Sequence, residues 1–92
     1  MDEQANVEGW QVEASKLPIT WTGDLNDDCT ASWAGLRLRA EEMKRAEWWW
    51  AVSDERTGAI LGDSNTSGVR VTTGKKAGAA AELVARKWLN SA

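Results

Sequence analysis

The sequence has no histidine, phenylalanine or tyrosine, and it has one cysteine and one proline. Histidine is the commonest general base at neutral pH, so we expect no enzyme activity. A single cysteine, Cys29, cannot form an internal disulfide, and the usual zinc and copper sites need several histidine or cysteine ligands. Asp28 and Glu41 could act as a carboxylate pair, but nothing in the sequence brings them together. We therefore expect no catalytic residues, no metal and no cofactor.

Long apolar runs are also missing. No stretch approaches the roughly 18 apolar residues that a membrane-spanning helix needs. A secretion signal starts with basic residues and continues with apolar ones, whereas residues 1 to 6 are polar and acidic. We therefore expect a cytoplasmic protein that makes no membrane contact. A length of 92 residues suits one hydrophobic core, so we predict a disordered N-terminus over residues 1–8 and a single α+β domain over residues 9–92.

The charge is negative overall, with a net value of -3, and it is unevenly distributed. Acidic residues dominate the first 28 positions, and basic residues are in excess in the remainder. Two interpretations follow from this asymmetry. In the simpler one, the acidic segment folds back over basic surface of the same molecule. In the other, it mimics a polyanion for some partner, and we prefer the simpler interpretation.

Residues 9–28 show a strand pattern followed by a turn pattern. Trp10, Val12 and Ala14 alternate with polar residues, which is typical of a half-buried strand. The only proline, Pro18, interrupts the pattern, which resumes at Ile19. We expect a hairpin or one bent edge strand here, followed by a loop over residues 23–28.

Residues 30–46 fit two patterns. A helical stripe passes through Trp33, Leu36, Ala40 and Met43, while Leu36, Leu38 and Ala40 would share one side of a strand. A helix would place Leu38 on its polar side. The segment also runs directly into the tryptophan-rich residues 48–53, a clear strand pattern, and this arrangement favours a β-meander. We therefore predict a strand.

The remaining pattern is a returning strand and then a helix. We expect a hairpin loop over residues 54–58, a strand over residues 59–62, a polar loop, and a short edge strand over residues 69–71. Thr72 or Thr73 should cap a helix that ends near Leu89. The apolar face of this helix is mostly alanine. Small side chains let a helix approach a sheet closely, so we predict that this face packs on the tryptophan-rich strand.

These elements predict an α+β fold, an antiparallel β-meander of three to five strands with a C-terminal amphipathic helix packed on one face. A single helix covers only one side of a sheet. On the uncovered side we expect Trp49, and also Trp33 among Arg37 and Arg39. In one interpretation the N-terminal residues cover this second side, through Trp10, Ile19 and Trp21.

In the other interpretation the second side is a binding surface. Tryptophan and arginine are enriched at protein interfaces, which points to a protein partner or a homodimer through Trp33, Trp49, Arg37 and Arg39. Stacking on single-stranded nucleic acid is the alternative, and the net negative charge disfavours it. We therefore predict a small protein-binding module.

The start of the C-terminal helix is a second candidate site. Lys75 and Lys76 follow Thr73 in the first turn, where lysine opposes the helix dipole unless an anion is nearby. A nucleotide-binding phosphate loop is excluded because the glycine spacing is wrong and Lys76 occupies the place of a serine or threonine. The site would bind a phosphate or a nucleic-acid backbone. Otherwise these lysines only confer solubility.

Residues 74–83 resemble, distantly, the basic, alanine-rich final helix of double-stranded RNA-binding domains, which also follows antiparallel strands. The resemblance implies a nucleic-acid-binding role for this helix. It covers only a small part of the chain, and the opening helix of that family is not evident in the sequence. We therefore do not assign the chain to the family.

Overall fold

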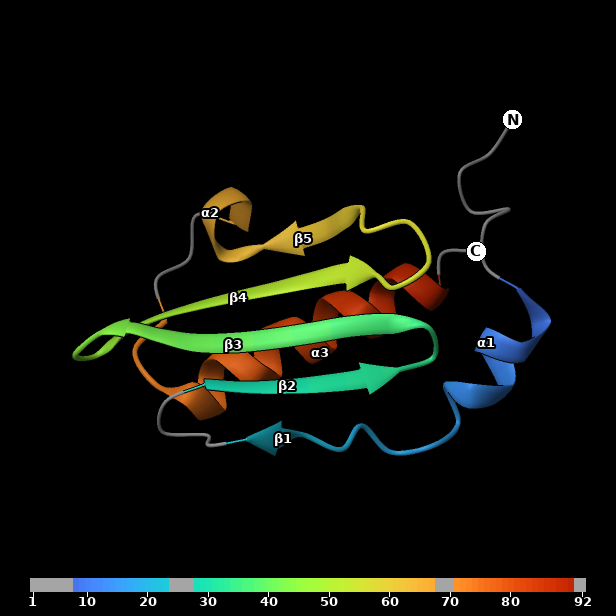
Figure 1. Cartoon of the computed structure of the whole chain (residues 1–92), viewed down its shortest axis with the longest axis horizontal. Coiled ribbons are helices and arrows are strands. Elements are labelled where there is room, and N and C mark those ends of the chain that lie inside the picture. Colours follow the sequence, from blue (N-terminus) through green and yellow to red (C-terminus); the bar gives the residue numbers. More distant parts are fainter. Residues whose placement is uncertain (1–7, 24–27, 68–70, 91–92) are drawn as a thin grey trace.

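A computed structural model describes residues 8–23, 28–67 and 71–90 (Figure 1). The predicted disorder over residues 1–8 lies outside this part of the chain, except for Glu8. The elements in chain order are α1 (Gly9–Ala14), β1 (Thr22–Gly23), β2 (Asp28–Trp33), β3 (Leu36–Lys44), β4 (Glu47–Asp54), β5 (Ile60–Asp63), α2 (Ser64–Ser67) and α3 (Gly74–Asn90). None of the described helices is both long and apolar enough to cross a membrane.

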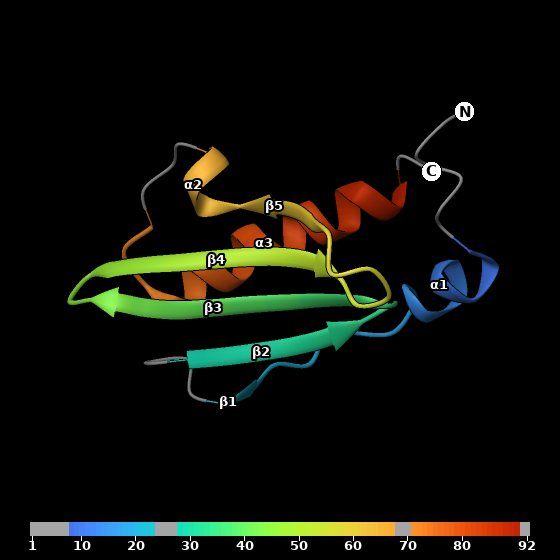
Figure 2. The same cartoon turned by 45° about the horizontal axis from the view of Figure 1, so that its top comes forward.

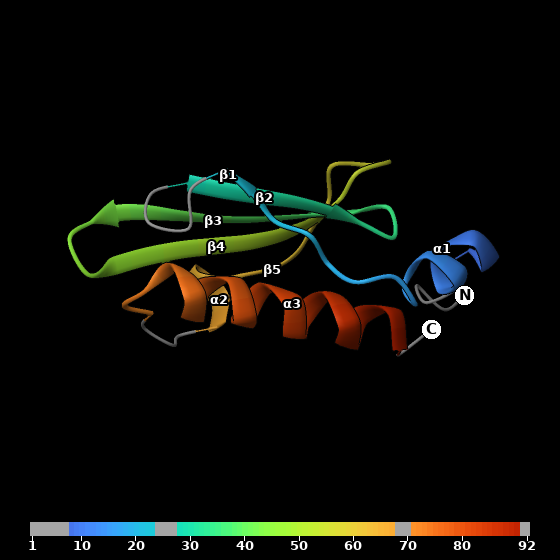
Figure 3. The same cartoon turned by 90° about the horizontal axis from the view of Figure 1, so that it is seen from below.

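The strands form one antiparallel sheet in the order β1-β2-β3-β4-β5, so each strand pairs with the next one along the chain (Figure 2). α3 runs along one face of this sheet (Figure 3). The predicted meander with a C-terminal helix is confirmed. The predicted edge strand over residues 69–71 lies mostly outside the described residues, although Val71 forms an isolated bridge with Trp48.

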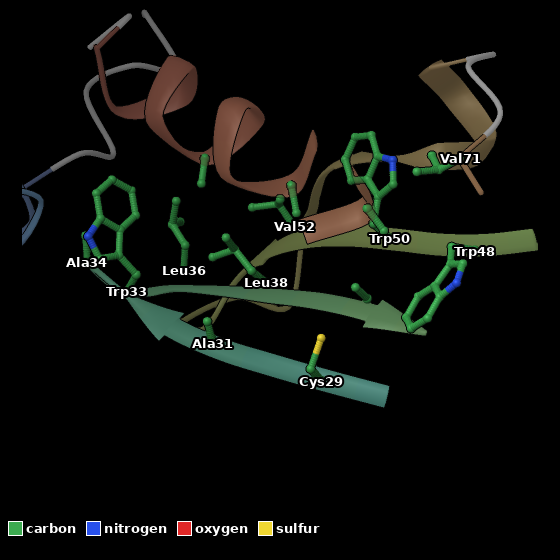
Figure 4. Packing of buried hydrophobic residues seen from close by; sticks show 14 of the residues in the cluster. Cys29, Ala31, Trp33, Ala34, Leu36, Leu38, Trp48, Trp50, Val52 and Val71 are labelled. Carbon is green, nitrogen blue, oxygen red and sulfur yellow. The ribbon is translucent and has the colours of Figure 1, made fainter. Parts of the chain in front are cut away.

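The core lies between α3 and the sheet. Trp33, Leu36, Leu38 and Val52 point from the strands toward the helix (Figure 4). The helix meets them with alanines that are completely buried, namely Ala77, Ala81 and Ala85. Small side chains on the helix allow the large indole rings of the sheet to fill the space between the two layers.

Strand was predicted for residues 30–46, and the structure has strand up to Lys44, with a tight turn that divides the segment into β2 and β3. Residues 45 and 46 form the turn into β4. Trp33 pairs directly with Leu36, so only Ala34 and Gly35 lie between the two strands. Both turn residues have positive φ, 53° at Ala34 and 77° at Gly35. Glycine adopts this conformation easily, whereas alanine does so rarely.

The expected position of Trp33 on the uncovered side is wrong. Directly paired residues of neighbouring strands point to the same face of a sheet. Trp33 is paired with Leu36 and therefore faces the core, where it is only 5% exposed. Its Nε1 donates a hydrogen bond of 2.9 Å to the carbonyl oxygen of Leu17, and the guanidinium carbon of Arg86 lies 5.2 Å from its ring centre.

The predicted N-terminal strand is also wrong, because residues 9–14 form the helix α1. The backbone N–H of Glu8 donates to Oε1 of Gln11 over 3.0 Å, which helps to fix the first turn. Gln11 is completely buried, while Trp10 and Val12 are about half exposed. Of the three alternating apolar residues, only Ala14 packs against the core, and it is partly buried. α1 lies beyond the end of the sheet, beside the β2–β3 turn (Figure 1).

The rest of the N-terminal segment packs on the helix side of the sheet. Nε1 of Trp21 donates a hydrogen bond of 2.8 Å to Oε2 of Glu82 in α3, and its ring lies against Gly78. Ile19 packs against the core. The interpretation in which Trp10, Ile19 and Trp21 cover the second side of the sheet is therefore wrong.

Arg56 in the β4–β5 hairpin links that hairpin to α1. Its Nη2 lies 3.0 Å from Oδ2 of Asp54, and its Nη1 lies 2.9 Å from Oε1 of Glu8. Asp54 is buried, with 4% of its surface exposed. The hydrogen bonds from Arg56, chiefly those of its side chain, lower the pKa of the Asp54 carboxyl below its ordinary value.

Candidate functional site

The side of the sheet opposite α3, here called the open face, is formed by alternate residues of the three central strands. These residues are Asp28, Thr30 and Ser32 of β2, Arg37, Arg39 and Glu41 of β3, and Trp49, Ala51 and Ser53 of β4. No described helix packs on this face (Figure 3). Small and polar side chains make up most of it, and Trp49 is its only aromatic residue.

The strand register arranges the open face in three rows. Asp28, Glu41 and Trp49 lie opposite one another in the first row. The second row has Arg39 at its centre, between Thr30 and Ala51. The third row places Arg37 between Ser32 and Ser53. Of the four predicted partner-binding residues, the structure thus brings Trp49, Arg37 and Arg39 together and separates Trp33 from them.

Arg39 is held over the indole ring of Trp49. Its guanidinium carbon lies 5.9 Å from the ring centre, within the range of a cation–π interaction. Its Nη2 lies 3.3 Å from Oε2 of Glu41, and its Nε lies 3.8 Å from Oδ1 of Asp28. Ion pairs as exposed as these contribute about 1 kcal/mol or less to stability. Their effect here is to position the guanidinium and to offset its charge.

An open hollow of about 520 Å³ lies beside Trp49. It is lined by residues of β3, β4 and α2, namely Arg39, Glu41, Met43, Glu47, Trp48, Trp49, Ser64 and Asn65. Met43 is 62% exposed. Oε2 of Glu47 accepts no hydrogen bond from any described residue and lies 3.3 Å from Nζ of the exposed Lys44.

Sequence reasoning missed Met43, Glu47, Ser64 and Asn65 as part of this site. The pairing of β3 with β4 is irregular between Glu42 and Lys44, next to Met43. Alternation along each strand nevertheless places Met43 on the face of Arg39 and Glu41, and Glu47 on the face of Trp49, so this signal could have found both residues. Ser64 and Asn65 reach the hollow because the chain turns into α2 directly after β5.

The predicted anion-binding residues lie elsewhere. Thr73 caps α3, because its Oγ1 accepts a hydrogen bond of 3.1 Å from the backbone N–H of Lys76. Lys75 and Lys76 are exposed in the first turn of α3. α3 forms the layer behind the sheet, so these lysines are not on the open face with Arg37 and Arg39 (Figure 3).

The register also brings together Asp28 and Glu41, which the sequence could not place. They are directly paired, and Arg39 lies between their carboxylates. Both groups thus belong to an ion-pair bridge. Within the described residues, no cluster of three or more cysteine, aspartate or glutamate side chains has the spacing of a metal site. No protein-family model matches the chain, and neither a curated protein nor a solved structure matches it.

Proposed function

We propose that the protein is a small non-enzymatic interaction module that binds a protein partner through the open face, with Trp49 and Arg39 at the centre of the contact. The observation that carries this proposal is the hollow beside Trp49 on a sheet face that α3 and the N-terminal segment leave uncovered. Tryptophan and arginine supply much of the energy of protein interfaces, because they combine large apolar area with polar groups.

The charges around the hollow favour a basic side chain of the partner. Glu41 and Glu47 both line it. Arg39 pairs with Glu41 and Asp28, and Lys44 pairs with Glu47, so three carboxylates are matched by only two cations and negative charge is in excess. A lysine or arginine that enters the hollow can contact the indole ring of Trp49 and a carboxylate at the same time. The proposed partner therefore presents a lysine or arginine to this face.

The geometry gives less support to the alternative, nucleic-acid or anion binding. A phosphate backbone is bound by several cations that follow one path. Here two carboxylates already pair with Arg39, and Lys75 and Lys76 lie in the other layer. Nucleic-acid binding is therefore the alternative that the experiment below distinguishes from protein binding.

The test follows the indole N–H resonance of Trp49 by NMR, which a Trp49→Phe variant assigns. Oligoarginine and oligolysine peptides, an oligoglutamate peptide and a single-stranded oligonucleotide are titrated separately. We expect the basic peptides to shift this resonance and the acidic peptide to leave it unchanged. Glu47→Gln should weaken the shift, whereas Glu13→Gln, which removes an exposed carboxylate from α1, should not.

Three results would overturn the proposal. The first is no shift with millimolar basic peptide, a concentration at which even weak binding is visible. The second is an equal shift in Glu47→Gln and in the unmodified protein. The third is a shift with the oligonucleotide alone, which would support the nucleic-acid alternative instead.

A further inference from the structure

Arg37, at the centre of the third row of the open face, has no ion-pair partner among the described residues. Its side chain is exposed, and its neighbours in the row, Ser32 and Ser53, are small and uncharged. Glu55 reaches the same end of the face, but its Oε2 accepts a hydrogen bond of 3.0 Å from Oγ of Ser32. The guanidinium of Arg37 can therefore bind a carboxylate of another molecule.

The other end of the open face has the opposite charge. In its first row, Asp28 and Glu41 share the guanidinium of Arg39. Glu47, which also lines the hollow, adds a third carboxylate that only the exposed Lys44 offsets. The open face is therefore negative around the hollow and positive at its third row.

The strand geometry fixes the separation of these two ends. Arg37 and Glu41 lie on the same face of one strand, β3, four residues apart. A strand rises about 3.3 Å per residue, so the two positions are about 13 Å apart. A partner segment in extended conformation covers the same distance in four residues, and it turns the side chains at its two ends to the same side.

We infer that the partner presents two opposite charges on one extended segment, a lysine or arginine for the hollow and, four positions away along its chain, an aspartate or glutamate for Arg37. An arginine can hold a carboxylate through two parallel hydrogen bonds. Complementary charges at both ends of a contact fix its register and exclude partners with like charges. The inference rests on the proposed function and adds to it the spacing of charges that the site selects.

The test uses pairs of short peptides that have the same composition and the same net charge. In one peptide of each pair a glutamate lies four positions from the arginine, and in the other it lies next to the arginine. One pair has the glutamate after the arginine and a second pair has it before, because the direction of the bound segment is open. NMR titrations measure the affinity of each peptide.

Two resonances report the two ends of the face separately. The indole N–H of Trp49 reports the hollow. The δ1 methyl group of Ile60 reports the third row, because Ile60 is paired with Ser53 and is 60% exposed. Ile19, the only other isoleucine, packs against the core on the helix side of the sheet and is the internal control.

In at least one pair, the peptide with the four-position spacing should bind about three- to fivefold more tightly than its partner peptide, the gain expected from one exposed ion pair. It should shift both Trp49 and Ile60, whereas its partner peptide should shift Trp49 alone. Arg37→Gln should abolish the affinity difference and the Ile60 shift. Lys87→Gln is the matched control, because it removes an exposed cation from α3, and it should preserve both.

The inference is wrong if the two peptides of each pair bind equally, if Arg37→Gln preserves their difference, or if Lys87→Gln abolishes it. Equal binding within both pairs, with a shift of Trp49, overturns this inference and leaves the proposed function standing. If no peptide shifts Trp49, both are overturned. The two failures are therefore distinguishable in one set of titrations.

Discussion

Nε2 of Gln11 donates a hydrogen bond of 2.7 Å to the carbonyl oxygen of Ala34. Gln11 is completely buried, and Ala34 holds the strained first position of the β2–β3 turn. Trp10, the residue before Gln11, packs against Gly35, where an added Cβ would lie 2.7 Å from Cη2 of the indole. Two neighbouring residues of α1 therefore fix the helix on the end of the sheet.

Gln11→Leu should lower the free energy of unfolding by about 1–3 kcal/mol, because it leaves the buried carbonyl of Ala34 without this hydrogen bond. Urea unfolding followed by circular dichroism measures the change. Val12→Leu, at an exposed position of the same helix, should change stability by less than about 0.5 kcal/mol. Equal effects of the two substitutions would show that the hydrogen bond does not anchor α1.

Ala81→Leu should destabilise the protein by about 1–3 kcal/mol, because Ala81 is completely buried between α3 and the sheet and the larger side chain overpacks this contact. Thermal and urea unfolding measure the loss. Ala79→Leu is the matched control on the exposed side of the same helix and should be close to neutral. A neutral Ala81→Leu would mean that α3 packs less closely on the sheet than the structure indicates.

Trp21→Phe should cost about 1–2 kcal/mol, because the variant keeps an aromatic ring but loses the partly buried hydrogen bond to Glu82. Glu82→Ala removes the acceptor of the same hydrogen bond, so Trp21→Phe should cost less stability when it is introduced into the Glu82→Ala variant. Urea unfolding of the two single variants and the double variant measures this difference. An equal cost in both backgrounds would show that the hydrogen bond does not contribute to stability.

The contact between Asp54 and Arg56 should make stability depend on pH in the acid range. The pKa of Asp54 is lowered in the folded state, relative to about 3.9 in an unfolded chain. Its stabilising contribution is therefore complete above about pH 4 and is lost as the pH falls toward the folded-state pKa. The stability difference between the unmodified protein and Asp54→Asn should be constant near neutral pH and should narrow in acid.

The measurement is urea unfolding of both proteins at a series of pH values. Repeating it in an Arg56→Gln background removes the main cause of the lowered pKa, so the acid-range narrowing should largely disappear. If the stability difference between the unmodified protein and Asp54→Asn stays constant or widens as the pH falls below about 4, the pKa of Asp54 is not lowered.

The sheet and α3 could be predicted because their patterns are long. The apolar pattern of β4, which is rich in tryptophan, fits only a strand, and the alanine face of α3 fits only a helix. Residues 30–46 fit both types, and the strand was chosen because the segment leads directly into β4. α1 could not be predicted, because six residues with alternating apolar side chains fit a strand equally well. Its anchor is the long-range contact of Gln11 with Ala34, and no local pattern reveals such a contact.

The candidate site was predictable only in part, and the reason lies in two turns. Trp49, Arg37 and Arg39 were placed on one face correctly, because alternation holds within a strand. Trp33 was misplaced because alternation was continued through Ala34 and Gly35, a turn without the Asn-Gly or Asp-Gly signature of most tight hairpins. Met43 and Glu47 follow the same alternation as Arg39 and Trp49 and could have been placed with them. The contribution of α2 depends on the sharp change of direction after β5, which the sequence does not encode locally.

The thiol of Cys29 lies on the core side of β2 and is only 2% exposed. A reagent that modifies thiols can reach it only while the edge of the sheet near β1 and β2 is separated from the layer beneath. Because the chain contains no second cysteine, the rate of that modification reports the frequency of this one opening event. Mass spectrometry of the modified protein therefore measures how often this part of the sheet opens, with the thiol reagent as the only added label.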